Sequence, residues 1–228
     1  MVGWRSTRRR RLMDNRTRMN VCPDPVTDTL ALLDWRRRVA ELYAEVRASS
    51  DPAAGWRRWH QTRAALFSEH PQSPIAPADR RGYSGPHMYD YGPAWRVLAR
   101  VSPAELKRFE LPASNTEVMT FSRFARAHFT LGGSELSLEL YLLESYGGGL
   151  FVPFADATSG HETYGAGRYL LDTVKGADLG CQDGSLILDF NFAYQPSCSY
   201  DPHWMCPLAP PANRLPLAVR AGERLTSG

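Results

Sequence analysis

The chain has 228 residues, a length that fits one larger domain or two small ones, and its apolar fraction of 43% is typical of globular proteins. It contains no run of about 18 apolar residues, so we expect no transmembrane helix. The net charge of +3 arises at the N-terminus. Residues 1–20 contain seven arginines and one aspartate and carry +6, which leaves −3 for the other 208 residues.

Residues 1–26 are expected to form a disordered basic tail and an extended lead-in. The four arginines at 8–11 could bind nucleic acid or an acidic surface, but no aromatic residues or folded motif accompany them. With the −3 charge of the remainder, this argues against a nucleic-acid partner. No apolar segment follows the arginines, so we expect no secretory signal and a cytoplasmic location, where disulfides are rare.

Two helices are expected next in the chain. Thr27 or Asp28 can cap a helix over 29–48, which has apolar residues at spacings of three and four. The stripe consists of Leu32, Trp35, Val39, Leu42 and Val46. The second helix is expected over 52–69, because Pro52 suits an early helical position and the prolines at 71 and 74 end it.

From residue 71 onward the pattern favours β structure, and its clearest hairpin spans 124–142 around Gly132-Gly133. Pairing Leu131 with Ser134 gives one apolar face and one polar face. The apolar pairs are Phe129–Leu136, Ala127–Leu138 and Ala125–Leu140, and the polar pairs are Arg126–Glu139 and His128–Ser137. We therefore expect His128 at the surface.

Further strands are expected at 95–101, 116–121, 150–154, 168–173, 186–192 and 217–220, and the proline-rich segment 207–216 is expected to wrap the surface. The predicted fold class is mostly β (α+β): an antiparallel β barrel or sandwich with two N-terminal helices and an irregular proline-rich C-terminal wrap. Residues 27–228 are expected to form a single globular domain, with helices over 29–69 and a β portion over 87–220.

The first group of chemically capable residues lies in 154–169, between two apolar strands. Asp156, His161 and Glu162 are candidate catalytic residues that could move protons or bind a metal. Arg168 could hold an anionic group with its planar guanidinium, and Tyr164 is a further substrate-binding candidate. The alternative is a hydrogen-bonded turn in which Arg168 pairs with Asp156 or Asp189.

The second group lies in 189–207. Asp189 and Asn191 share one face of a strand and, with Tyr194, are candidate substrate-binding residues. Cys198, His203 and Cys206 are weak metal candidates, because their spacing is poor for a structural zinc site. A disulfide or two close thiols, and buried packing cysteines, are the alternatives. We expect Cys198 and Cys206 to lie near each other.

At these two groups the chain resembles the prokaryotic family known as domain of unknown function 1684 (DUF1684). The resemblance covers roughly 30–224 and is most specific in the last third of the chain. It rests on 151–154, Asp156, 158–160, 162–165, 167–170, 188–191, Ala193, Tyr194, Pro196, Cys198, Tyr200, 206–208, Pro210, Pro211, 213–215 and 221–223, with 70–74 as an earlier motif. It implies no reaction, and it leaves the cofactor unknown.

The leading hypothesis is a domain that binds a small molecule. Such a domain could also be an enzyme that acts on an anionic small molecule through the Arg, Asp, His and Glu residues named above. The alternative is a non-catalytic structural or interaction module in which the same residues form a buried polar network. A pocket containing Arg168 and Asp189 would favour the first hypothesis. A buried pair without a cavity would favour the second.

Overall fold

The computed structural model describes residues 24–112, 118–144 and 148–226. It begins with two helices, α1 (Pro25–Ala48) and α2 (Pro52–Glu69). Each helix begins with proline and is capped by the aspartate before it: Asp24 accepts the amides of Val26 and Thr27, and Asp51 accepts the amide of Ala53. The predicted cap at Thr27 or Asp28 is therefore wrong, because Asp24-Pro25 starts the helix earlier. The predicted tail at 1–26 lies almost entirely outside the described residues.

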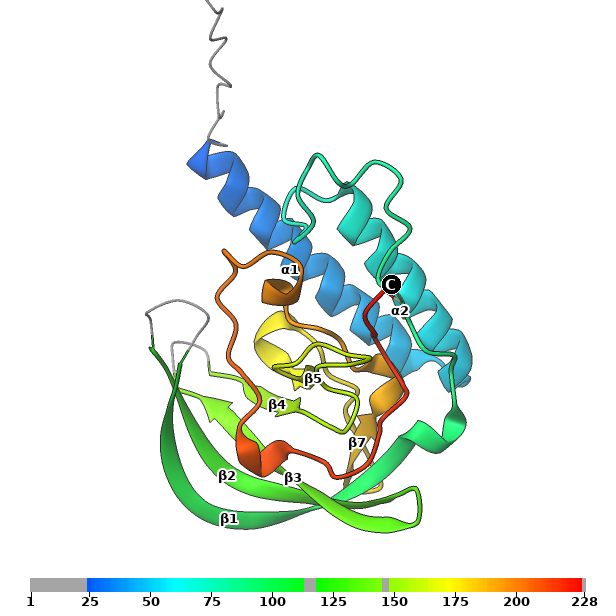
Figure 1. Cartoon of the computed structure of the whole chain (residues 1–228), viewed down its shortest axis with the longest axis vertical. Helices are drawn as coiled ribbons and strands as arrows, with labels where there is room; N and C mark the ends of the chain where they lie inside the picture. Colours follow the sequence, from blue (N-terminus) through cyan, green and yellow to red (C-terminus); the bar gives the residue numbers. More distant parts are fainter. Residues whose placement is uncertain (1–23, 113–117, 145–147, 227–228) are drawn as a thin grey trace, which may run out of the picture.

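The strands form a curled, seven-stranded antiparallel sheet, a half-barrel with the order β5-β4-β3-β2-β1-β7-β6 (Figure 1). The strands are β1 (Arg96–Pro112), β2 (Val118–Leu131), β3 (Ser134–Leu143), β4 (Leu150–Phe154), β5 (Arg168–Asp172), β6 (Cys181–Gln182) and β7 (Ser185–Asp189). The predicted mostly β, α+β class with two N-terminal helices is confirmed. The barrel is open, since β5 and β6 are the two edges.

The β2–β3 hairpin has the predicted register, from Leu131 opposite Ser134 to Ala125 opposite Leu140. The predicted apolar face is largely buried, because Phe129, Ala127 and Leu138 all point into the core. The polar face is only partly exposed to solvent, so the expectation that His128 lies at the surface is only partly met. Glu139 on that face is buried, and His128 is half-buried with a ring nitrogen 2.9 Å from Ser102 Oγ.

Several predicted strand limits differ from the structure. The predicted strands at 116–121 and 124–131 are one continuous strand, β2, and β1 runs on to Pro112 through an irregularity after Pro103. Strand β7 ends at Asp189 because a 3-10 helix (Phe190–Phe192) starts there. Residues 217–220 form no strand and belong to an irregular C-terminal wrap.

The two helices lie on one side of the curled sheet, and the C-terminal wrap runs between them and the long strands (Figure 1). Asn213 fixes the wrap to the sheet, because its side chain exchanges hydrogen bonds with the Glu139 backbone and donates to the Pro153 carbonyl. Aromatic residues from the helices, the sheet and the segment just after β7 form a core cluster between these layers. Its largest members are Tyr43, Trp59, Phe121, Tyr141, Phe151, Tyr169, Phe192 and Tyr194. Among the described residues, no helix combines the length and apolar character needed to cross a membrane.

Candidate functional site

Arg168, the first residue of β5, has a side chain that is 1% exposed. One terminal nitrogen lies 2.8 Å from Asp156 Oδ2, so the two charges form a buried ion pair. The same guanidinium donates to the carbonyls of Val219 (2.8 Å), Glu223 (3.0 Å) and Ala221. Within the described chain, its Nε has no hydrogen-bond partner. Arg168 therefore joins β5 to residues 219–223 of the wrap.

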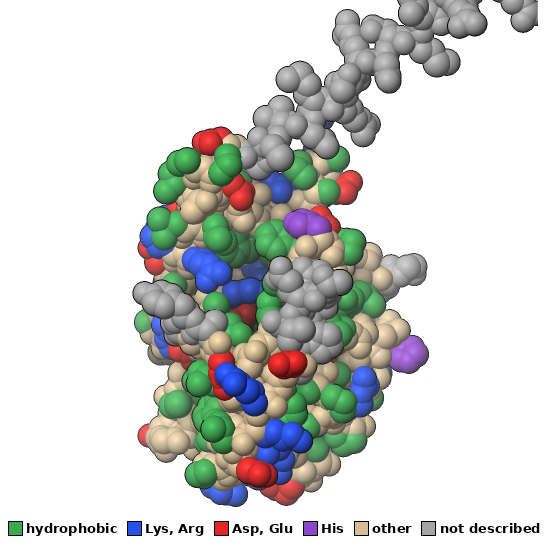
Figure 2. All heavy atoms as spheres, turned by 90° about the vertical axis from the view of Figure 1, so that its left-hand side faces the viewer, with side chains coloured by type: hydrophobic (Ala, Val, Ile, Leu, Met, Phe, Trp, Pro, Cys, Tyr) green, Lys and Arg blue, Asp and Glu red, His purple; other side chains and the backbone are tan. Residues whose placement is uncertain are grey.

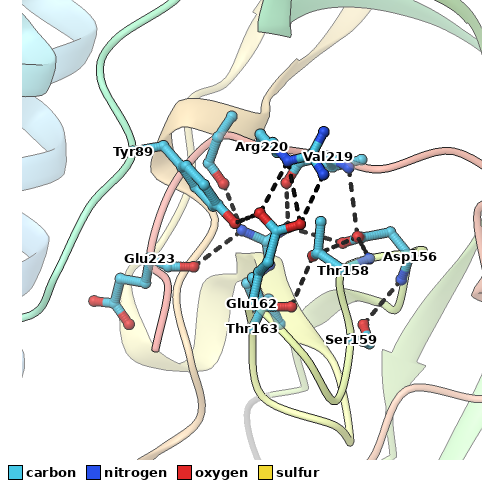
Figure 3. Close-up of polar contacts among 11 residues, drawn as sticks. Tyr89, Asp156, Thr158, Ser159, Glu162, Thr163, Val219, Arg220 and Glu223 are labelled. Carbon is cyan, nitrogen blue, oxygen red and sulfur yellow. Dashed lines mark hydrogen bonds and ion pairs between the residues drawn. The ribbon is translucent and has the colours of Figure 1, made fainter. Parts of the chain in front are cut away.

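The other carboxylate oxygen of Asp156, Oδ1, accepts the remaining hydrogen bonds of this buried network. It accepts the Thr158 amide and hydroxyl, both at 2.6 Å, and the Val219 amide at 3.4 Å (Figure 3). Burial lowers the pKa of Arg168 below its ordinary value, and the Asp156 carboxylate opposes that shift. Since both side chains are satisfied mainly by each other and by the backbone, their geometry favours the structural alternative over a ligand contact.

Glu162 belongs to a second, more exposed cluster on the same loop (Figure 3). Arg220 binds both carboxylate oxygens, at 2.8 and 2.9 Å, and the Tyr89 hydroxyl donates at 2.9 Å. These hydrogen bonds, that of Arg220 first, lower the pKa of Glu162 to about 2. Neighbouring His161 is exposed and does not share these contacts. A catalytic role for Asp156, His161 and Glu162 stays a prediction.

Asp189 and Asn191 form a third group, separate from Arg168. Asp189 Oδ1 accepts the Asn191 amide at 3.0 Å and its side-chain nitrogen at 2.8 Å, which caps the 3-10 helix that follows β7. The Asn191 side chain also exchanges two 2.9 Å hydrogen bonds with the Gly92 backbone. Burial raises the pKa of Asp189. The pair thus joins β7 to the segment before β1.

Cys198 and Cys206 lie together, as expected, with the Cys198 amide 3.3 Å from Cys206 Sγ. Tyr164 extends this group, because its hydroxyl lies 3.9 Å from Cys198 Sγ. His203 does not join them: its ring is turned to Asp201, 2.8 Å away, on the surface. In the part of the chain that the structure describes, no three His, Cys, Asp or Glu side chains are grouped as metal ligands.

A cavity of about 330 Å³ lies between the helices, the concave sheet and the wrap. Its walls are mainly apolar and aromatic, and they include Leu32, Trp35, Val39, Leu42, Tyr43, Trp59, Phe67, Phe121, Phe151, Tyr194, Trp204 and Pro207. The space-filling view shows this face hollowed, with Lys and Arg atoms gathered in the hollow (Figure 2). Of the residues predicted from sequence, Tyr194 and Cys206 line the cavity; Arg168 and Asp189 do not.

Arg63 on α2 is the most unusual residue in this lining. Its side chain is 15% exposed and packs on the rings of Phe67 and Tyr194, at 4.4 and 4.8 Å from their centroids. Its Nε binds Glu223, which is fully buried and also accepts the Tyr200 hydroxyl at 3.0 Å. Within the described residues, the two terminal nitrogens of Arg63 have no hydrogen-bond partner.

Further charged side chains line the cavity. Asp172 accepts the Tyr194 hydroxyl at 3.3 Å, and Lys175 Nζ lies 3.7 Å from its carboxylate. Arg36 reaches the Val174 carbonyl from α1 at 2.9 Å. The cavity lining therefore carries three cationic side chains, Arg36, Arg63 and Lys175, against the single carboxylate of Asp172.

Sequence reasoning missed Arg63, although a signal was present. It lies four residues after Trp59 and four before Phe67, so it occupies the apolar face of α2. An arginine on an apolar, aromatic helix face indicates a guanidinium in the protein interior, where arginine is rare unless it is paired.

Comparison with known proteins agrees with this fold. Residues 81–224 match the family described as Protein of unknown function (DUF1684). The chain is also similar to the solution NMR structure of an uncharacterized protein from Haloarcula marismortui, with a TM-score of 0.55 and 35% identity, over 75% of this chain and 93% of that one. The comparison with curated proteins found no match. The chain therefore belongs to the DUF1684 family.

Proposed function

We propose that this protein binds a small amphipathic anion in the cavity between its helices and its sheet. The observation that carries the proposal is the combination of aromatic walls with Arg63, whose terminal nitrogens lack hydrogen-bond partners among the described residues. Binding sites for small molecules are typically apolar cavities with a few convergent polar groups.

The apolar walls would hold the body of the ligand. A volume of about 330 Å³ is at the lower end of the range of about 300–1,000 Å³ for ligand pockets. This size favours a compact ring system or a short chain over a nucleotide or a peptide. The apolar stripe on α1, which includes Leu32, supports the same interpretation. Leu32 is 39% exposed, and a bound ligand would remove part of its apolar surface from water.

The cationic groups would hold the anionic end. Arg63 is already oriented by Glu223 through Nε, which leaves its planar end available for a carboxylate, sulfonate or phosphate. Lys175 adds a second positive charge, partly offset by Asp172. A neutral ligand of the same shape would leave the terminal nitrogens of Arg63 unpaired in an apolar setting, which costs free energy.

In this proposal Arg168 and Asp156 have a positioning role. They hold residues 219–223 against β5, and Glu223 in that segment orients Arg63. The buried polar network expected as the alternative would thus support the cavity without contacting the ligand.

The test uses 8-anilino-1-naphthalenesulfonate, an aromatic anion, titrated by calorimetry. We expect one site per chain. Val39→Trp should fill part of the cavity and weaken binding at least tenfold. Val26→Trp is the matched control, since Val26 lies on the same helix, is exposed and does not line the cavity; it should change the affinity less than twofold. Equal affinity of the two variants, with both folded by circular dichroism, would refute the proposal.

A further inference from the structure

Cys198 and Cys206 are held together by the local backbone. A 3-10 helix (Ser197–Ser199) places Cys198, and the chain then returns so that Cys206 Sγ accepts the Cys198 amide at 3.3 Å. Both residues are buried, whereas Cys181 is exposed at the start of β6. The Cys206 sulfur therefore lies against the backbone of Cys198, and the two side chains need little movement to form a bond.

The two thiols differ in their place relative to the cavity and in charge. Cys206 is part of the cavity wall and Cys198 is not, although both are buried, Cys206 at 1% and Cys198 at 8% exposure. The interaction with the Cys198 thiol, together with the positive charge of Lys175 and the backbone N–H groups of Cys198 and Ser197, lowers the pKa of Cys206 against the opposing effect of burial. The interaction with the Cys206 thiol and burial raise the pKa of Cys198. Because thiolates are the nucleophilic form, Cys206 is the attacking sulfur and Cys198 the resolving one.

We propose that Cys198 and Cys206 form a redox-active dithiol that a small organic disulfide, entering through the cavity, oxidises to an intramolecular disulfide. Two independent features carry this inference: the 3.3 Å contact of Cys206 Sγ with the Cys198 amide and the place of Cys206 in the cavity wall. The inference needs no amphipathic anion, so it stands or falls separately from the proposed function.

The reaction is a pair of thiol–disulfide exchanges. The Cys206 thiolate attacks one sulfur of the external disulfide, whose S–S bond breaks, and the first thiolate leaves with the bonding electrons and takes a proton from solvent. Cys198 then releases its proton to solvent, and its thiolate attacks Cys206 Sγ. The mixed disulfide breaks and releases the second thiolate, which is protonated in turn. The protein dithiol loses two electrons, and the external disulfide is reduced to two thiols.

The test uses full-length protein carrying Cys22→Ser and Cys181→Ser, so that only the pair remains. This variant is incubated at pH 7 with bis(2-hydroxyethyl) disulfide, quenched with acid, unfolded and alkylated with N-ethylmaleimide, and its intact mass is measured. We expect both alkylations to disappear together, with no retained adduct. Two persistent alkylations, or a stable double adduct, would overturn the inference.

Single variants in the same background assign the roles. Cys198→Ser should stop at a mixed disulfide on Cys206, because no resolving thiol remains. Cys206→Ser should acquire its adduct at least tenfold more slowly, because Cys198 does not line the cavity and has a raised pKa. Equal rates for the two variants would show that both thiols react only through unfolding, which contradicts the inference. If a single variant does not fold, the pair-only protein still gives the deciding result.

Discussion

Replacing Arg168 by lysine tests the structural role assigned to the buried ion pair. Lysine keeps the positive charge but loses the planar fork that reaches Asp156 and three carbonyl groups of the C-terminal wrap. A single ammonium group cannot occupy the positions of both terminal nitrogens, so the two acceptors of one nitrogen become unsatisfied. Each buried polar group without a partner costs about 1–3 kcal/mol, and we expect a total loss of about 2–6 kcal/mol.

For a chain of this size, each kcal/mol lowers the melting temperature by about 2–4 °C, so Arg168→Lys should melt at least about 4 °C below the wild type in calorimetry. Arg220→Lys is the matched control. This variant makes the same arginine-to-lysine change at an exposed residue of the C-terminal wrap. It should change the melting temperature by no more than about 2 °C. Melting of Arg168→Lys within about 1 °C of the wild type would refute the reasoning.

Two further predictions concern the C-terminal wrap. The pKa of Glu162 is about 2 in the folded protein against an ordinary 4.5, so its contribution to stability is present above about pH 5 and is lost as the pH falls towards 2. The difference in melting temperature between wild type and Glu162→Gln should therefore shrink from pH 7 to pH 2.5, and a difference that grows would contradict the assignment. Asn213→Ala removes three buried hydrogen bonds to Glu139 and Pro153 and should cost about 2–4 kcal/mol in urea unfolding. A loss below about 0.5 kcal/mol, within the range of ordinary surface substitutions, would show that the wrap does not depend on this contact.

The parts of the fold that were predictable from sequence depend on local signals. The Gly132-Gly133 turn has the positive φ angles that a two-residue hairpin needs, and this turn fixes the register of the paired strands. The start of α1 was misplaced for an equally local reason. Asp24-Pro25 and Thr27-Asp28 are competing start signals, and the side chain of Asp24 caps the earlier one.

The candidate site was harder to predict from the sequence, because it depends on contacts between distant parts of the chain. The proximity of Cys198 and Cys206 followed from a short loop, and Arg168 with Asp156 was one of two expected pairs. That Arg168 also binds the carbonyls of residues 219–223 had no sequence signal, because backbone acceptors have no residue-type pattern. The Leu32–Trp35–Val39 stripe was predictable, but a stripe that lines a cavity has the same periodicity as one that packs against a neighbour.

The central claim, a cavity that selects an amphipathic anion, is tested most directly with two probes of the same shape. 8-Anilino-1-naphthalenesulfonate carries a negative charge that N-phenyl-1-naphthylamine lacks. A charge-assisted hydrogen bond contributes about 1.5–3 kcal/mol, so the anion should bind the wild type at least about tenfold more tightly. Lys175→Gln should reduce this ratio severalfold, while Lys107→Gln, at the chain's only other lysine and outside the cavity, should leave it unchanged. Equal affinity for the two probes, or the same ratio in both lysine variants, would contradict the account.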